Sequence, residues 1–377
     1  MNLQNWYRKQ GSVVIVWLIL ITFSTIALAS CGNKPSPVVV HKPSTVVVQK
    51  QRDNTKRTFG DWCREKDSLS SETKHTVEVL LGQAETADCD VADQELSTLT
   101  RLSLGRGKAG DITNEISDIK PLASLTNLKC LWLSHNKISD IKQLESLTKL
   151  THLDLDNNLI RDIKPLESLT KLTHLNLGDN EISDIKPLES LTDLTSLDLS
   201  NNLIDDIKLL ASFTKLTQLS LNNNRISDLK LLASLTELRE LSLNNNQISD
   251  LKLLASLTNL TSLYLYSNKI RDIKPLASLT QLTWLGLYDN LIRDIKPLES
   301  LTNLTILFLD NNLIRDIKPL EFLTNLTYLH LRNNLLSDIK PLESLTNLRE
   351  LYLGGNLIAP KTCPLKQKSI CIWEIWD

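Results

Sequence analysis

Apolar positions recur with a fixed period of 22 residues from Leu128 onward. In each period Leu stands eight, five and three residues before an Asn. Apolar residues follow the Asn at plus two, five, eight and eleven in every period except the last. The Asn column holds Asn136, Asn158, Asn180, Asn202, Asn224, Asn246, Asn268, Asn290, Asn312, Asn334 and Asn356. An earlier copy, which begins at Leu99, reaches Asn114 only after seven additional residues. The chain therefore carries one irregular and eleven regular repeats.

Each period predicts the same two elements. The Leu-x-Leu piece alternates with period two, which indicates a short strand with both Leu side chains buried. The following Asp-Ile-Lys-Pro-Leu segment is too short and too rich in Pro for a full helix, so we expect a 3₁₀ or extended return segment. We expect the buried column Asn to bond the backbone of the adjacent coil. The Asp column, as at Asp140, Asp162 and Asp184, is predicted to cap the return turn.

The pattern LxxLxLxxNxI resembles the leucine-rich repeat in its 22-residue bacterial, internalin-like form, over residues 96–360. The resemblance implies an α/β leucine-rich repeat solenoid, shaped as a curved right-handed horseshoe. A parallel β-sheet would line its concave face, and 3₁₀ or extended segments its convex face. Such a solenoid needs a cap at each end, because each coil buries its apolar residues only against its neighbours.

The first thirty residues have the pattern of an export signal. Arg8 and Lys9 precede an apolar run over residues 12–27, and small residues follow. The tetrapeptide ending at Cys31 resembles the lipobox of bacterial lipoproteins, which implies that Cys31 is acylated and becomes the mature N-terminus. An uncleaved membrane anchor or ordinary cleavage is the alternative. Residues 31–58 are predicted to be a flexible tether.

Two short segments flank the repeats, and each contains two cysteines. Residues 59–95 are predicted to form a helical N-terminal cap, with Phe59, Trp62, Val77, Leu80 and Leu81 at helical spacing. Residues 361–377 are predicted to form the C-terminal cap. Because export permits disulfides, we expect the pairs Cys63–Cys89 and Cys363–Cys371. A zinc site is the alternative, although no CxxC pair supports it. Cys130, on a strand, is left over as an expected free thiol.

The fold would expose two residues per strand, six and four positions before each column Asn, and a further position at the edge. Aromatic residues gather at these positions in the late repeats, where the Leu and Ile columns already fill the core. Exposed aromatic surfaces of this kind are typical of binding sites. The predicted partner-binding residues are Trp284, Tyr264, Tyr266, Tyr288, Phe308, Tyr328, His330 and Tyr352. Drift on an unselected surface is the alternative.

Composition and charge narrow the function classes. A formal charge of −2 gives no basic excess for nucleic acid. Aromatic residues make up only 5% of the chain, so their gathering in late repeats carries more weight. No nucleophile elbow, HExxH, phosphate loop or dinucleotide fingerprint is present, and we expect neither an enzyme nor a cofactor. A weaker metal candidate is formed by His152 and His174 with Asp154.

These features together predict a non-enzymatic, exported protein, lipid-anchored in the bacterial cell envelope or at the cell surface. Its concave face would bind a protein partner, and the protein itself is expected to be a monomer. A carbohydrate ligand on the same aromatic face is the first alternative. A metal-dependent enzyme at His152 and His174, or an intracellular signalling scaffold, are further alternatives.

Overall fold

The computed structural model describes residues 31, 57–105 and 114–374. The predicted signal peptide, the tether from residue 32 to residue 56 and the last three residues of the C-terminal cap lie outside the described residues. The chain forms two compact units. The first unit extends to Ile182 and also includes residues 187–193; the second contains residues 183–186 and the chain from Leu194 onward.

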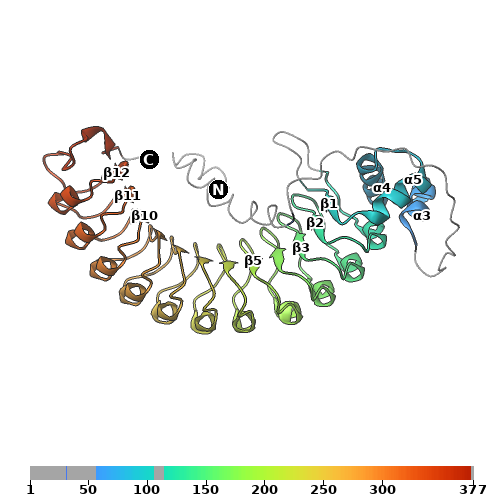
Figure 1. The fold of residues 1–377 in the computed structure, drawn as a ribbon, viewed down its shortest axis with the longest axis horizontal. Coiled ribbons are helices and arrows are strands. Elements are labelled where there is room, and N and C mark those ends of the chain that lie inside the picture. The colour runs from blue at the N-terminus through green and yellow to red at the C-terminus, as the bar shows by residue number, and fades with distance from the viewer. Residues whose placement is uncertain (1–30, 32–56, 106–113, 375–377) are drawn as a thin grey trace. The chain divides into compact units, whose positions relative to one another are not determined.

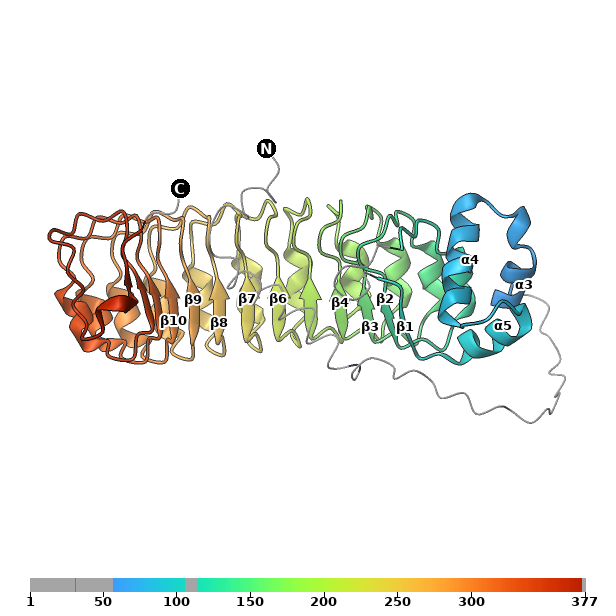
Figure 2. The ribbon, with the colours of Figure 1, turned by 90° about the horizontal axis from the view of Figure 1, so that it is seen from above.

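Three helices open the described part of the first unit: α3 (Phe59–Arg64), α4 (Ser71–Gln83) and α5 (Cys89–Thr98). Their N-caps are Thr58, Ser70 and Asp88, whose side-chain oxygens accept hydrogen bonds from backbone N–H groups of the first turn. The short 3₁₀ helix η1 (Lys66–Ser68) links α3 to α4. The helices lie beside strand β1 (Arg101–Ser103) in Figure 2. They end at Thr98, three residues beyond the predicted boundary of the cap.

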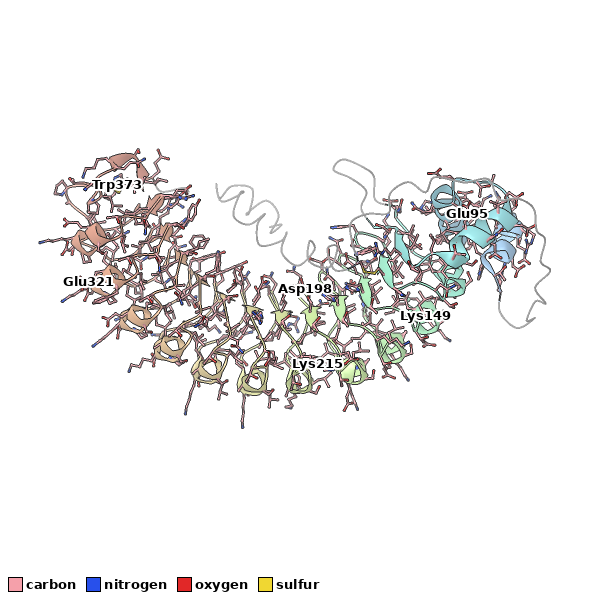
Figure 3. All side chains as sticks on the ribbon, in the orientation of Figure 1. Glu95, Lys149, Asp198, Lys215, Glu321 and Trp373 are labelled. Carbon is pink, nitrogen blue, oxygen red and sulfur yellow. A yellow bond between two sulfur atoms is a disulfide. The ribbon has the colours of Figure 1, made fainter. Side chains whose placement is uncertain are left out.

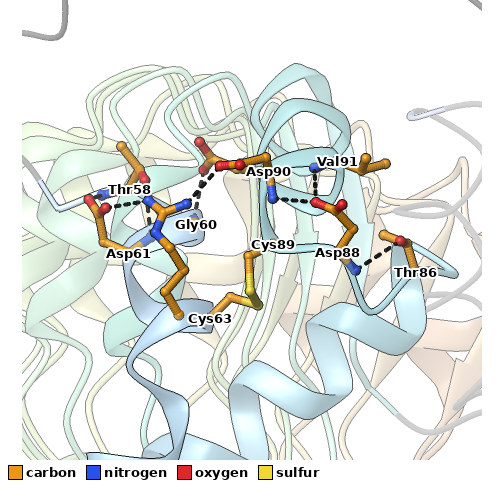
Figure 4. Close-up of a disulfide and its surroundings, with 11 residues drawn as sticks. Thr58, Gly60, Asp61, Cys63, Thr86, Asp88, Cys89, Asp90 and Val91 are labelled. Carbon is orange, nitrogen blue, oxygen red and sulfur yellow. Dashed lines mark hydrogen bonds and ion pairs between the residues drawn. A yellow bond between two sulfur atoms is a disulfide. The ribbon is translucent and has the colours of Figure 1, made fainter.

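The helical cap buries the apolar face that the sequence indicated. Phe59, Val77 and Leu80 are fully buried. Trp62 is only half-buried, and the Arg57 guanidinium lies 3.5 Å from the centroid of its ring. A disulfide joins Cys63 of α3 to Cys89 of α5, as expected from the sequence, and Figure 4 shows it beside the capping bonds of Asp88.

Among the described residues of the first unit, four parallel strands follow one another in chain order. They are β1, β2 (Cys130–Trp132), β3 (His152–Asp154) and β4 (His174–Asn176). Neighbouring strands pair at a step of one repeat, so that Leu131 faces Leu153 and Leu153 faces Leu175. The step from β1 to β2 is longer, with Leu102 facing Leu131, because it contains the seven-residue insertion.

In the described part of the second unit, nine parallel strands also follow chain order, and they line one side of the ribbon in Figure 1. They are β5 (Ser196–Asp198), β6 (Gln218–Ser220), β7 (Glu240–Ser242), β8 (Ser262–Tyr264), β9 (Trp284–Gly286), β10 (Ile306–Phe308), β11 (Tyr328–His330), β12 (Glu350–Tyr352) and β13 (Cys371–Ile372). The central Leu of each of β5 to β12 is fully buried. The side chains on either side of that Leu form what we call the strand face.

Each return segment is a five-residue 3₁₀ helix, which is one of the two conformations predicted for it. The series is η2 (Lys120–Ser124), η3 (Lys142–Ser146), η4 (Lys164–Ser168), η5 (Lys186–Ser190), η6 (Lys208–Ser212), η7 (Lys230–Ser234), η8 (Lys252–Ser256), η9 (Lys274–Ser278), η10 (Lys296–Ser300), η11 (Lys318–Phe322) and η12 (Lys340–Ser344). The Asp two residues before each helix accepts the N–H of its first Lys, as in Asp140 with Lys142 at 2.9 Å. This confirms the capping role predicted for the Asp column.

The column Asn residues connect consecutive coils through buried amides, which confirms their predicted structural role. In the first unit, Asn158 Oδ1 accepts the N–H of Ile138 at 3.0 Å, and its Nδ2 donates to Leu133 O and Leu155 O, each at 3.0 Å. In the second unit, Asn312 makes the same three bonds to Ile292, Leu287 and Leu309. Each amide therefore satisfies backbone groups of its own coil and of the preceding coil.

The residue before each column Asn, from Asn136 to Asn334, adopts a left-handed backbone conformation. The φ angles of these ten residues lie between 49° and 57°, and most of the residues are Asn or Asp, which tolerate this region best after Gly. Ser267 is one of the exceptions, with φ 52°. The turn therefore constrains the position before the column Asn as well as the column itself.

The described part of the C-terminal cap contains a short 3₁₀ helix, η13 (Lys368–Ile370), and the last strand, β13. Strand β13 pairs in parallel with β12, and the Cys363–Cys371 disulfide closes the cap, as expected from the sequence. Over the described residues, we find no helix with the length and apolar character needed to span a bilayer.

Candidate functional site

Five rings on the strand face of the second unit form a continuous series of contacts, which we call the ring row. Their centroids are separated by 4.0 Å (Tyr264–Trp284), 5.3 Å (Trp284–Phe308), 4.2 Å (Phe308–His330) and 4.2 Å (His330–Tyr352). The parallel register places Tyr264, Phe308, His330 and Tyr352 at equivalent positions of strands that lie about 4.8 Å apart. In β9 the equivalent position is Gly286, and the Trp284 ring takes its place in the row. A second pair, Tyr266 and Tyr288, stacks at 4.3 Å along the edge.

The strand face lies opposite the 3₁₀ helices. Figure 3 shows Asp198 of β5 on the strand side of the second unit, whereas Lys215 and Glu321 lie toward the outer side. Phe322 ends η11 on that outer side and is 50% exposed. It therefore provides an exposed aromatic ring remote from the ring row.

A glycine makes room for the largest ring of the row. A Cβ at Gly286 would lie 2.7 Å from Cζ3 of Trp284 and 2.8 Å from its Cη2. The indole of Trp284 therefore lies over Gly286, two residues further along the same strand. A side chain at position 286 would occupy the place of the indole, so the sequence Trp-Leu-Gly determines how Trp284 lies on the face.

Three of the predicted partner-binding residues are buried, which corrects the expectation that all of them are exposed. Tyr264 and Phe308 are each 5% exposed and His330 is 7% exposed. The cause is the close spacing of strands, since each large ring covers its neighbour. Trp284, Tyr266, Tyr288, Tyr328 and Tyr352 remain partly exposed. The buried rings support the face, and the partly exposed rings are accessible from solvent.

Charged groups lie among the late rings. The carboxylate of Asp310 is 3.2 Å from Nδ1 of His330 and accepts the backbone N–H of Arg332 at 2.7 Å. The Arg332 guanidinium carbon lies 4.1 Å from the centroid of the Tyr352 ring. Within the described part of the chain, Nε2 of His330 and Nε of Arg332 are buried and have no hydrogen-bond partner. Polar groups of this region are therefore held in place by packing as much as by hydrogen bonds.

Burial shifts the pKa of several of these groups. It raises the pKa of Tyr352 to about 12, and the hydrogen bond that the Tyr352 hydroxyl donates to Glu350 acts in the same direction. Burial and the nearby Glu240 carboxylate raise the pKa of Tyr264. Burial also raises the pKa of Asp289 and lowers that of Arg332. Both tyrosines are therefore neutral hydrogen-bond donors near neutral pH.

The first unit carries the two histidines considered as metal ligands. The rings of His152 and His174 stack at 4.2 Å with an interplanar angle of 15°. Nδ1 of each ring lies within hydrogen-bond distance of the hydroxyl of the preceding Thr, and each hydroxyl already donates its proton to a backbone carbonyl. Nδ1 therefore carries the ring proton. Burial, with a smaller effect of His174, lowers the pKa of His152 to about 4.

The structure does not bring together the predicted metal candidate of His152, His174 and Asp154. Stacked imidazoles direct their in-plane lone pairs side by side, and Asp154 accepts the N–H of Asp156 instead. Among the described residues, the group whose ligand atoms lie within 4.8 Å of one another is Cys31, Cys130 and His152. The two sulfurs of that group form a disulfide, so no thiolate is available there.

The Cys31–Cys130 disulfide contradicts the expectation that Cys130 is a free thiol. Cys130 and Trp132 begin and end strand β2 of the first unit, and Cys31 packs against both residues. The predicted lipidation of Cys31 and this disulfide exclude each other, because one sulfur cannot form both bonds. No described cysteine is free.

Sequence reasoning missed Gly286 on the strand face and two charged residues at its edge, in the late repeats. Asp310 and Arg332 stand two residues before a column Asn, the same position as Tyr266 and Tyr288. Reading the whole of that column, rather than its aromatic members, would have found them. The sequence also indicated the role of Gly286, because a Gly two residues after a Trp, on the same side of a strand, leaves space for the indole.

The repeats, the parallel strands and the 3₁₀ returns define a leucine-rich repeat solenoid protein. The family described as "Leucine Rich repeats (2 copies)" matches most of the chain, over residues 97–146, 126–168, 148–190, 170–212, 192–235, 214–251, 236–278, 280–321 and 324–365. The chain therefore belongs to the leucine-rich repeat family, in its internalin-like form.

Two solved structures show the relationship in more detail. An internalin, InlF, from Listeria monocytogenes is 38% identical, with a TM-score of 0.68 over 76% of this chain and 90% of that chain. A leucine-rich repeat protein from Leptospira interrogans is 30% identical, with a TM-score of 0.57 over 64% of this chain and 70% of that chain. A search of curated proteins found no match.

Proposed function

We propose that the strand face of the second unit binds a protein partner without catalysing a reaction on it. The observation that carries this proposal is the ring row with its edge pair, whose partly exposed members are not needed to fill the core. Trp and Tyr contribute most of the binding energy at many protein interfaces. The internalin-like character of the repeats supports the same function, because internalin-like proteins hold protein partners on this face.

The buried rings give the surface a fixed geometry. Phe308 and His330 lie between Trp284 and Tyr352, so the partly exposed rings lose little conformational freedom when a partner binds. We propose Trp284, Tyr328 and Tyr352 as the main contact residues, with Tyr266 and Tyr288 at the edge. Tyr264, Phe308 and His330 are proposed to support these rings from below.

The experiment is capture of the partner by cross-linking on intact cells, followed by affinity measurement with variants. The double variant Trp284→Ala/Tyr328→Ala should abolish binding while the circular dichroism spectrum stays unchanged. Phe322→Ala removes an exposed ring from the outer side and should leave the affinity as it is. Unchanged affinity of the double variant would refute the proposal. A glycan array with the same variants tests the carbohydrate alternative.

We also propose that the protein is exported and held in the cell envelope by a lipid on Cys31. The signal pattern and lipobox before Cys31 support this, and the two cap disulfides, Cys63–Cys89 and Cys363–Cys371, suit an oxidising compartment. Lipidation requires that Cys31 is not paired with Cys130. Palmitate labelling that is lost in Cys31→Ala and kept in Cys130→Ala would support the anchor. Peptide mapping that finds every Cys31 joined to Cys130 would refute it.

A further inference from the structure

Carboxylates outnumber cations around the late rings, on the strand face and along the edge where Tyr266 and Tyr288 stack. Asp289, Asp310 and Glu350 are half-buried there, and Arg332 is the cation whose guanidinium lies over the Tyr352 ring. Counting these four groups, three negative charges against one positive leave a net charge of two negative. A partner that covers this surface has to compensate that charge, because unpaired buried carboxylates are costly.

Asp289 is the carboxylate with the least compensation. It accepts hydrogen bonds from Asn311 Nδ2 at 2.5 Å and from Ser267 Oγ at 3.3 Å, both of them neutral donors. Among the described residues no ion pair includes Asp289, and the charged group that influences it is another acid, Asp310. Burial accordingly raises its pKa. A cation from outside the chain would stabilise its ionised form.

Asp289 directly follows Tyr288, which stacks on Tyr266 and is partly exposed. Trp284 belongs to the same coil and is also partly exposed. The faces of aromatic rings attract lysine and arginine side chains, most strongly when the rings are partly desolvated. An acidic partner segment would instead meet like charge at Asp289, Asp310 and Glu350. Rings and carboxylates in this coil therefore favour the same kind of ligand.

We infer that the partner presents a lysine- or arginine-rich segment, whose cationic side chains contact the Trp284 and Tyr288 rings and pair with Asp289. This inference rests on the proposed function, because it specifies the chemistry of the partner that the strand face binds. The partner's apolar residues would cover the remaining rings, and its basic residues would give the complex its orientation.

The experiment measures binding of fluorescent hexalysine to the full chain by anisotropy, with hexaglutamate as the control peptide. Asp289→Asn removes the charge, keeps an acceptor for Asn311 and suits the left-handed backbone at this position. The matched control is Glu343→Gln, which removes one charge from η12 on the outer side. We expect Asp289→Asn to raise the Kd roughly three- to tenfold, Glu343→Gln to leave it unchanged, and added salt to weaken binding.

Equal effects of Asp289→Asn and Glu343→Gln would overturn the inference, since they would indicate attraction by net charge alone. Absence of hexalysine binding, or equal binding of hexaglutamate, would also overturn it. The proposed function is judged separately. One result would separate the two proposals: Trp284→Ala/Tyr328→Ala abolishes binding of the captured partner, whereas Asp289→Asn does not weaken it. This result would support the protein-binding strand face and refute the basic segment of the partner.

Discussion

Replacing one column Asn in the middle of the second unit tests the structural role of these amides. Asn246 Oδ1 accepts the N–H of Ile226 at 3.0 Å. Its Nδ2 donates to Leu221 O at 2.9 Å and to Leu243 O at 3.2 Å. The change Asn246→Ala removes all of these bonds. We therefore expect it to destabilise the protein without changing the outline of the strand face.

The size of the effect follows from which groups lose their only partner. Leu221 O keeps a bond from Asn224, and Leu243 O keeps one from Asn268. The N–H of Ile226 loses its acceptor in a buried site, which costs about 1–3 kcal/mol. The cavity left by the missing amide adds to this cost. We expect the free energy of unfolding to fall by about 3 kcal/mol.

The assay is urea unfolding followed by far-ultraviolet circular dichroism, with amide hydrogen exchange at Ile226 as a local measurement. The matched control is Asn259→Ala, because Asn259 donates to Thr236 O at 2.9 Å from an exposed position. Its cost should be about 0.5 kcal/mol or less. If Asn246→Ala costs no more than Asn259→Ala, or if the Ile226 N–H keeps its protection, the buried amide is not what holds the coils together.

Further predictions concern the turns, the site, the histidines and the disulfides. Ser267→Asn should stabilise the protein by about 0.5 kcal/mol, because Asn tolerates φ 52° better than Ser; a lower urea midpoint would contradict this. Gly286→Ala should displace the Trp284 indole, change the near-ultraviolet circular dichroism and weaken partner binding. The control is Gly82→Ala, because a Cβ at Gly82 has no neighbouring atom within 4 Å. Because burial lowers the pKa of His152 to about 4, the folded state binds a proton less readily than the unfolded state. About 3 kcal/mol of stability should therefore be lost as the pH falls from about 6.5 to about 4, and His152→Gln should remove most of that dependence. Loss of the Cys63–Cys89 disulfide, whose cysteines are 26 residues apart, should lower the free energy of unfolding by about 3.5 kcal/mol. Loss of the Cys363–Cys371 disulfide, whose cysteines are 8 residues apart, should lower it by about 2.5 kcal/mol. Equal shifts of the melting temperature would contradict this dependence on loop length.

The repeat architecture could be predicted because every coil packs against its neighbours with the same residue types at the same positions. A Leu-x-Leu strand, a column Asn and an Asp before the return turn are local signals, and their constant spacing fixes the register of neighbouring strands. The paired cysteines of each cap were predictable for a similar reason, since few partners lie nearby in sequence. Cys130 was not, because its partner Cys31 is 99 positions away and belongs to no repeat.

The candidate site was predicted in position but not in exposure. The column positions indicated which side chains point away from the core. The solvent exposure of these side chains also depends on the size of the side chains in the neighbouring coil. Tyr264 is covered because Trp284 is its neighbour, and His330 because it lies between Phe308 and Tyr352. The charge balance around Asp289 likewise depends on contacts between coils, as with Asn311. One column of the repeat alignment, taken alone, does not show how side chains of neighbouring coils cover or charge one another.

The hydrogen bonds of the column Asn residues have a consequence for how this binding surface can change in evolution. Each amide reaches only its own coil and the preceding coil, as Asn312 does with Leu309 and Leu287. Deleting or duplicating one whole 22-residue unit therefore leaves every amide with equivalent partners, whereas an insertion of a few residues inside a coil breaks that match. Recombination between the DNA segments that encode equivalent repeats could lengthen or shorten the surface in steps of one coil. The distance between two contact residues on a partner could thus be matched by the number of repeats, without a change in any side chain.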